Sequence, residues 1–505
     1  MAFQINRKKI AKNTLTLYVR QAITMFISFF AVRVTLEQLG VEDYGLNNLV
    51  GSIVAMFSFI NGSMGTAVQR FYSFEIGREN KDRLKRIFGV GLYLHFIVAT
   101  ITLVISEFFA LFLLGKMNIP PDRMTAAHVV FQTGVATLVL GVVSVPYSAM
   151  LRAREMFSQT ALVEIVQAFL RLGVLYLLVI LPFDKLVALS LLNFGVSFGG
   201  ILAFVVMARQ FEETHSGPIR DQNLMKEMLK FVSLLILTVL TQLLNTQGIV
   251  MLINLFFGLT INAAYAVAAQ VQHAINAFVV NFKSSMVPQI VAAYGAGDLK
   301  SMHRLIDFGT KVTFLMMLMI TLPIIFFTRM ILTLWLNNPP MYAAELVMLT
   351  LIAINVSSFT YFHYQGVHAS GKIVQQQAWM SGLYLLSIAF VFVLFKLGFS
   401  FYAAVIVNMV VGVLQVWINL FYARKYIEYS VLNFTKTIVL PVILVSVFAV
   451  GCFYVCSVVA NTDCARFILV MVADIVFLPL ISLWVLLNRD ERNQVFGFMK
   501  KICVN

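Results

Sequence analysis

Cationic and polar side chains lie inside several long apolar stretches of this chain. Arg20 lies with Thr24 and Ser28 in the first stretch, and Arg171 lies near the centre of a later one. Residues three or four positions apart share one face of a helix, so such stripes can line a common surface. A charged side chain inside a membrane span is costly and by default marks a functional path. Because arginine binds phosphate through a planar fork of donors, these stripes predict a water-filled cavity that receives an anion.

The candidate cavity residues are the cations, the amides and one histidine of these stretches. They are Arg20, Arg33, Arg171, Gln242, Asn245, Gln270, His273, Asn281 and Lys283. Arg33 and Lys283 lie near the ends of their stretches, where Lys283 can equally extend its ammonium group to lipid phosphate. Glu164 lies two helical turns from Arg171, and a purely structural Glu164–Arg171 ion pair is the alternative to a role in binding.

Two other groups of residues in apolar stretches have two interpretations each. The second stretch carries a stripe of small residues, namely Gly51, Ala55, Ser58, Gly62 and Gly65. Small residues are common where membrane helices pack closely, so close packing and a cavity wall both explain this stripe. Glu107 and Asp474 are isolated acids, for which binding of a proton or a cation is the alternative to a structural role.

The composition places these stretches in a membrane. Of the 505 residues, 60% are hydrophobic and 12% are charged, whereas soluble domains contain about 25% charged residues. A soluble core could not bury so many apolar side chains, and a disordered chain would be far less hydrophobic. The apolar runs are long and continuous, which excludes a barrel of alternating ten-residue strands. The predicted fold class is therefore an all-α polytopic membrane protein.

The apolar runs predict fourteen spans, because a helix needs about 20 residues to cross the hydrocarbon. The predicted spans are 14–36, 46–67, 87–114, 126–149, 159–182, 186–207, 231–257, 263–286, 312–334, 344–366, 378–396, 400–422, 437–460 and 466–487. Cytoplasmic loops carry an excess of Lys and Arg. With the N-terminus in the cytoplasm, the large majority of the 37 Lys and Arg residues fall on that side. Both termini are therefore predicted to be cytoplasmic.

Charge and motifs narrow the function classes. The net charge of +14 is explained by this topology and by attraction to anionic membrane lipids, so no nucleic acid is expected as a partner. A nucleotide-binding P-loop is absent, since Gly115-Lys116 is followed by Met117 and Gly371-Lys372 by Ile373. The four cysteines show no metal-ligand spacing. We therefore expect neither an enzyme nor a bound cofactor or metal.

A weak internal repeat predicts two lobes of six helices in parallel orientation. Residues 68–89 can be aligned with 288–309, and Leu39-Gly40 with Phe257-Gly258. Repeats of this kind are frequent in transporters. The predicted organisation is an N-lobe at 1–207, a cytoplasmic linker at 208–230, a C-lobe at 231–436, and two further helices with a cytoplasmic tail at 437–505.

Three short motifs resemble a known family. They are Arg33 followed by Leu39-Gly40-Val41-Glu42-Asp43-Tyr44-Gly45-Leu46, then Pro288-Gln289-Ile290 with Gly297-Asp298, and then Ala369-Ser370-Gly371-Lys372. With the fourteen predicted spans, this pattern resembles the polysaccharide (Wzx-like) flippases of the multidrug/oligosaccharidyl-lipid/polysaccharide (MOP) superfamily. The resemblance covers essentially the whole chain.

The resemblance implies a MATE-like fold whose two lobes surround a cavity that opens alternately to each side. It also implies a bacterial inner-membrane location and flipping of undecaprenyl-pyrophosphate-linked oligosaccharide units for O-antigen, capsule or exopolysaccharide assembly. The glycan polymerase and the glycosyltransferases of that pathway are the implied protein partners.

Two other functions remain as alternatives. A cation-coupled multidrug exporter of the same superfamily would share the fold, although such exporters usually have twelve helices and acids in the cavity. A membrane-embedded O-antigen polymerase or ligase usually has a large external loop. The longest outer loops predicted here, Lys116–Thr125 and Leu336–Ala343, have only about ten residues, which argues against that class.

Overall fold

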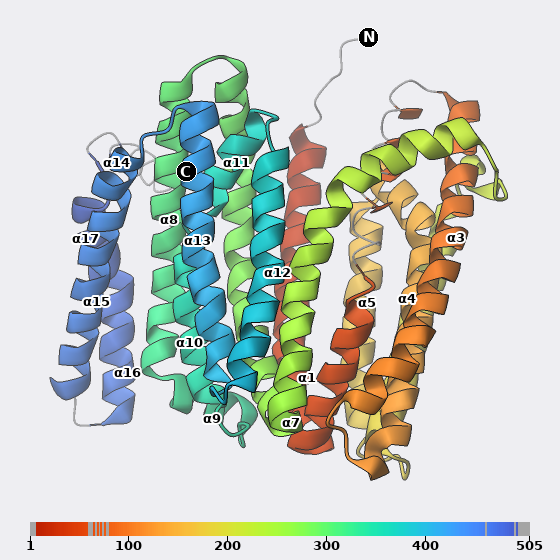
Figure 1. The fold of residues 1–505 in the computed structure, drawn as a ribbon, viewed down its shortest axis with the longest axis horizontal. Coiled ribbons are helices and arrows are strands. Elements are labelled where there is room, and N and C mark those ends of the chain that lie inside the picture. Colours follow the sequence, from red (N-terminus) through yellow and green to blue (C-terminus); the bar gives the residue numbers. More distant parts are fainter. Residues whose placement is uncertain are drawn as a thin grey trace. The chain divides into compact units, whose positions relative to one another are not determined.

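The computed structural model describes residues 7–58, 64–65, 68–69, 71–72, 75–76, 80–459, 462–488 and 491–492. Side chains are described from residue 19 onward, with gaps at 110–111, 113, 230–238, 281, 284–285, 288, 292, 457, 459 and 463–464. Every regular element in this part of the chain is helical (Figure 1). The predicted all-α class is confirmed.

The helices follow one another with short connections. In the first half they are α1 (Arg7–Ala55), α3 (Lys81–Leu113), α4 (Met124–Ala153), α5 (Phe157–Leu177), α6 (Lys185–Ala208) and α7 (Gln222–Gly295). In the second half they are α8 (Leu299–Phe326), α9 (Thr328–Leu336), α10 (Ala343–Ser357), α11 (Tyr361–Ala369), α12 (Val374–Lys396), α13 (Tyr402–Ile427), α14 (Val431–Phe434), α15 (Leu440–Val459), α16 (Asp463–Val472) and α17 (Leu478–Val485). Short π-helical turns, η4 (Thr435–Val439) and η5 (Ala473–Phe477), join α14 to α15 and α16 to α17.

Twelve helices of the described part are long and apolar enough to cross a membrane. Two of them, Val19–Ala55 and Val239–Val280, have 37 and 42 residues, which at about 1.5 Å per residue far exceeds a hydrocarbon layer of about 30 Å. Each is broken once, at Gly40 and at Gly258. Counting the two parts of each broken helix separately gives the fourteen segments that the sequence predicts.

The two breaks have the same backbone geometry. Gly40 has φ 77° and ψ 174°, and Gly258 has φ 79° and ψ −171°. This region of backbone space is essentially closed to residues with a Cβ. The sequence predicts short loops at 37–45 and 258–262, but the structure has helix on both sides of a single glycine. The matching breaks support the predicted repeat of Leu39-Gly40 and Phe257-Gly258.

Contacts between Cα atoms divide the chain into two compact units. The first unit comprises 1–263 with 336–340, and the second comprises 264–335 with 341–505. Ion pairs attach segment 209–221 to the first unit, since Lys85 Nζ lies 2.6 Å from Glu212 and Arg86 Nη2 lies 2.6 Å from Asp221. The hydrogen bond from Lys85 lowers the pKa of the Glu212 carboxyl. The predicted lobe boundaries differ from these contact units and stay a prediction.

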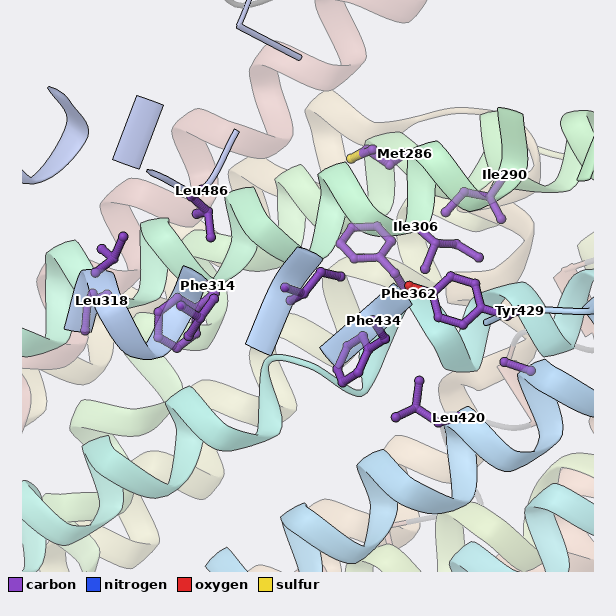
Figure 2. Close-up of a cluster of buried hydrophobic side chains, with 14 of the residues drawn as sticks. Met286, Ile290, Ile306, Phe314, Leu318, Phe362, Leu420, Tyr429, Phe434 and Leu486 are labelled. Atoms are coloured by element: carbon purple, nitrogen blue, oxygen red, sulfur yellow. The ribbon is translucent and has the colours of Figure 1, made fainter. Parts of the chain in front are cut away.

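Each unit has its own apolar core. In the second unit, Ile306 and Phe314 of α8 pack with Phe362 of α11 and with Tyr429, which follows α13 (Figure 2). Large apolar side chains such as Phe108 and Ile180 are instead exposed, at 70% and 79%. In a multi-pass membrane protein these side chains face the lipid tails, which is why they need no protein partner.

Candidate functional site

A polar cavity of about 680 Å³ lies within the first unit. Its walls come from the second part of α1 and from α4, α5 and α6. The polar side chains in the walls are Asn47, Ser58, Thr133, Thr137, Gln167, Arg171, Ser190, Asn193 and Ser197. Arg171 is the one charged side chain among the described residues that line this cavity.

Helix α5 presents one polar face to the cavity region. Glu164, Gln167 and Arg171 are spaced by three and four residues, so they lie on the same face of the helix. Arg171 Nη2 donates to Ser197 Oγ of α6 at 3.1 Å, and Gln167 Nε2 donates to the carbonyl of Val196 at 3.3 Å. These bonds place the guanidinium and the amide against α6 while both side chains still line the cavity.

Two features leave polar and open surface in the walls. Asn193 Oδ1 is buried and has no hydrogen-bond partner in the described structure. A buried acceptor without a partner is costly, and a ligand hydroxyl or amide could satisfy it. Gly51, Ala55 and Ser58 of α1 also line the cavity, so this part of the small-residue stripe forms a wall. Gly62 lies outside the described residues, and Gly65 lies close to Arg152.

Glu164 pairs with Arg20 and not with Arg171. Arg20 Nη1 lies 2.6 Å from Glu164 Oε2, and the two side chains are 27% and 40% exposed. The suggested Glu164–Arg171 pair is wrong, because two turns of one helix separate these residues by about 10 Å. Helix α1 packs against α5 instead, which brings Arg20 to Glu164. The stripe partner Thr24 donates its hydroxyl to the Arg20 carbonyl at 2.9 Å and so is satisfied within its own helix.

The remaining candidates of the first unit lie away from this cavity wall. Arg33 pairs with Glu37 at 3.0 Å one turn further along α1, and Asn337 Nδ2 also donates to Glu37 at 2.8 Å. Gln242 is exposed, and Asn245 is buried at 6% exposure. None of these three is a lining residue of the cavity. Their role in binding stays a prediction.

The candidates of the second half belong to the other unit. Gln270 is half-buried and His273 is exposed. The ammonium group of Lys283 lies 5.4 Å from the centre of the Tyr361 ring, which gives it a cation–π partner. The side chain of Asn281 lies outside the described residues. Substrate binding by these four residues also stays a prediction.

Sequence reasoning missed several polar contacts that hold α7 within the first unit. Asn48 Nδ2 donates to Asn262 Oδ1 at 2.8 Å, and the Asn118 amide donates to Asn254 Oδ1 at 3.1 Å. Gly45 approaches Leu259 so closely that a Cβ at Gly45 would lie 2.2 Å from the Leu259 carbonyl oxygen. Gly45 and Leu259 follow the two glycine breaks in their helices, so both breaks contribute to this contact.

A hydrolase-like motif in the cavity wall is not a nucleophile site. Gly195-Val196-Ser197-Phe198-Gly199 matches the Gly-x-Ser-x-Gly pattern, which in hydrolases sits on a sharp turn between a strand and a helix. Here the motif lies inside α6, and the Ser197 hydroxyl accepts a hydrogen bond from Arg171. No histidine is among the described residues that line the cavity. Ser197 therefore positions Arg171 and lacks a base that could activate it.

Comparison with known proteins supports a transporter fold. Residues 19–177, which include α5 and most of the cavity wall, match the MatE family. The structure of the lipid II flippase MurJ in an inward closed conformation superposes with a TM-score of 0.71 at 13% identity, covering 94% of this chain and 98% of that chain. An inward-facing multidrug resistance MATE family transporter of the MOP superfamily gives a TM-score of 0.67 at 13% identity, covering 81% and 98%. The chain has the fold of the MOP superfamily.

A third MOP structure shows that pocket charge varies within this fold. It is a MOP superfamily transporter from Pyrococcus furiosus, with a TM-score of 0.56 at 14% identity, covering 83% of this chain and 97% of that chain. The reverse polarity of its binding pocket suggests a different function for that protein. No curated protein matches the sequence. The resemblance drawn from the sequence is thus confirmed at the level of the MOP fold, and the polysaccharide branch stays a proposal.

Proposed function

We propose that this chain is a secondary transporter that flips undecaprenyl-pyrophosphate-linked oligosaccharide across the bacterial inner membrane. The observation that supports this function is the cavity of the first unit, in which Arg171 is the one charged lining side chain of the described structure. A pyrophosphate group needs a cation, and arginine matches its oxygens with a fork of donors. Gln167, Asn193 and the wall hydroxyls offer hydrogen bonds to sugar hydroxyls.

The charge of the cavity favours this substrate over a cationic drug. An exporter of cations would need an acid in the cavity, whereas the described lining residues include no Asp or Glu. Glu164, the nearest acid on the same face of α5, is already paired with Arg20. A polyprenyl tail can remain in lipid throughout, so the cavity needs to hold only the polar head group.

The test is deletion of the gene in its own host, followed by complementation. Deletion should abolish surface glycan while lipid-linked repeat units accumulate on the inner leaflet. Arg171→Ala should lower glycan export about tenfold or more, the loss expected for a charge-assisted hydrogen bond, and Arg171→Lys should recover part of it. The matched control is Arg209→Ala, because Arg209 is an exposed arginine at the end of α6.

The same experiment separates the alternatives. Intact surface glycan together with greater sensitivity to cationic drugs after deletion would favour the multidrug exporter. Loss of polymer with single repeat units still displayed on the outer leaflet would favour a polymerase. Normal export by Arg171→Ala, at protein levels equal to the control, would remove Arg171 from the proposed binding site.

A further inference from the structure

Asp474 is a buried acid at the middle of the last membrane-spanning segment. It lies on the π-helical turn η5, where the amide of Leu478 bonds to the carbonyl of Ala473 five residues earlier. Its side chain is 3% exposed, and Oδ1 has no hydrogen-bond partner in the described structure. Single π-turns inside helices occur frequently at functional sites. The proposed substrate cavity, which lies in the first unit, does not use this group.

The surroundings of Asp474 are apolar. Val470, Ala473 and Leu478 of its own segment belong to the core of the second unit, together with Leu318 of α8 and Val445 of α15. Figure 2 draws Leu318 in this core, along with Leu486, which follows α17. An ionised carboxylate in such a place loses its hydration and receives no counter-charge in return.

Ring contacts fix the level of Asp474 along its neighbours. Phe327, directly after α8, meets Phe467 of α16 with ring centres 5.4 Å apart, and Phe326 meets Phe453 of α15 at 5.5 Å. Asp474 lies seven residues beyond Phe467, which is about 10 Å along the helix. The same step from Phe327 along α8 leads to Ile320, and from Phe453 along α15 to Ser446. Ser446 donates its hydroxyl to the Val442 carbonyl at 2.8 Å.

No ionisable side chain of the described residues on the packed helices faces this level. The ionisable groups on α8, α15 and α16 are His303, Arg304, Asp307, Lys311, Cys452, Tyr454, Cys456 and Arg466. Each lies at least about six residues, or about 9 Å, along its helix from the level of Asp474. A metal ion would need several oxygen or nitrogen ligands, and no group of three His, Cys, Asp or Glu occurs in the described part of the chain. The ligand that a single buried carboxylate can hold is a proton.

We propose that Asp474 is a proton-binding site, reached along the seam between α8 and α17. Two further buried hydroxyls without partners, Thr313 Oγ1 and Ser482 Oγ, are 0% exposed and lie on these two helices. By the ring-contact register, both are about two turns from Asp474, in the direction of Glu491. A hydroxyl can donate and accept at once, so it can pass a proton.

A buried ion pair ends this row of polar groups. Lys311 Nζ lies 2.9 Å from Glu491 Oε2, and the two side chains are 4% and 10% exposed. Ser482 is about 12 Å along the helix from Asp474, so transfer over this distance needs bridging water. The transfer itself is simple: a proton from solvent adds to the Asp474 carboxylate and leaves by the same route.

The site can be tested by infrared spectroscopy on the purified full-length protein with ¹³C-labelled aspartate. At pH 7 the wild type should show the carbonyl stretch of a protonated, labelled carboxyl group. Asp474→Asn should lose this signal, and Asp474→Glu should move it out of the labelled region while keeping a protonated carboxyl. Glu107→Gln is the matched control, because it removes the other isolated acid inside a span and should leave the signal unchanged.

The route has a separate test in the same samples. Ser482→Ala combined with Thr313→Val should slow exchange of the Asp474 proton for deuterium at least severalfold without changing its amount. An unchanged exchange rate would overturn the route, and a wild type without a protonated labelled carboxyl would overturn the site. Proton binding is measured here without substrate, so its failure would leave the proposed transport function untouched.

Discussion

At the residue scale, Arg171 illustrates how a costly charge is kept inside the membrane. Its guanidinium donates to Ser197 and also borders a cavity of about 680 Å³, so it has a protein partner and access to polar ligands. A charge in contact with lipid tails would have neither. Polar residue type alone identified Arg171 as a candidate. Gln167 and Asn193 could not be selected in the same way, because single amides also occur at ordinary contacts between helices.

A second residue-scale expectation concerns Gly45. Gly45→Ala should destabilise the protein by about 1–3 kcal/mol or more, because the new Cβ would lie 2.2 Å from the backbone oxygen of Leu259. Thermal unfolding of the purified protein measures this change. Gly173→Ala is the matched control: Gly173 lies in α5, and a Cβ there would meet no atom within 4 Å. Equal melting temperatures for the two variants would show that the contact with Leu259 is absent in the membrane protein.

At the element scale, the Arg20–Glu164 pair joins α1 to α5. Arg20→Ala leaves Glu164 without its partner, so we expect a lower protein level in the membrane than in the wild type. Arg20→Ala combined with Glu164→Ala removes both charges and should restore the level. If Arg20 also receives the substrate anion, glycan export stays abolished in the double variant. Immunoblots of membranes together with surface-glycan assays measure both outcomes, and normal export by the double variant would make the pair purely structural.

The helices themselves were largely predictable, and their breaks were not. Bilayer thickness constrains the length of each span strongly, so the fourteen segments follow from apolar length alone. The short connections after Gly40 and Gly258 look like loops in the sequence because they are polar. At the edge of a membrane, however, a polar helix and a polar loop have the same hydropathy, so composition does not distinguish them. The backbone angles of the two glycines supply that information.

At the scale of the whole molecule, the distribution of Lys and Arg predicts the orientation in the membrane. Reporter fusions after Asn80 and after Gln222 should be cytoplasmic, and a fusion after Pro121 should be periplasmic. Paired alkaline phosphatase and fluorescent protein reporters measure this directly, and each serves as the control for the other. A periplasmic signal at position 80 would invert the predicted topology.

The cavity was the part of the molecule least accessible from sequence. Its walls combine single faces of four helical segments, including the Thr133 and Thr137 face of α4 and the Ser190, Asn193 and Ser197 face of α6. Each face has helical spacing that the sequence displays, yet nothing in the sequence states which faces meet. The packing of α4 against α6 brings them together.

The breaks at Gly40 and Gly258 have a consequence in terms of chirality. Inverting the signs of their φ and ψ angles gives ordinary extended backbone, so each break has the shape that a right-handed (D) amino acid would adopt with ease. Ribosomes supply no such residue, and the achiral glycine is the one encoded substitute. Both positions are therefore closed to gradual substitution, whereas the apolar residues around them can be exchanged freely for one another. A semisynthetic chain with D-alanine at position 40 should keep the break that L-alanine would destroy.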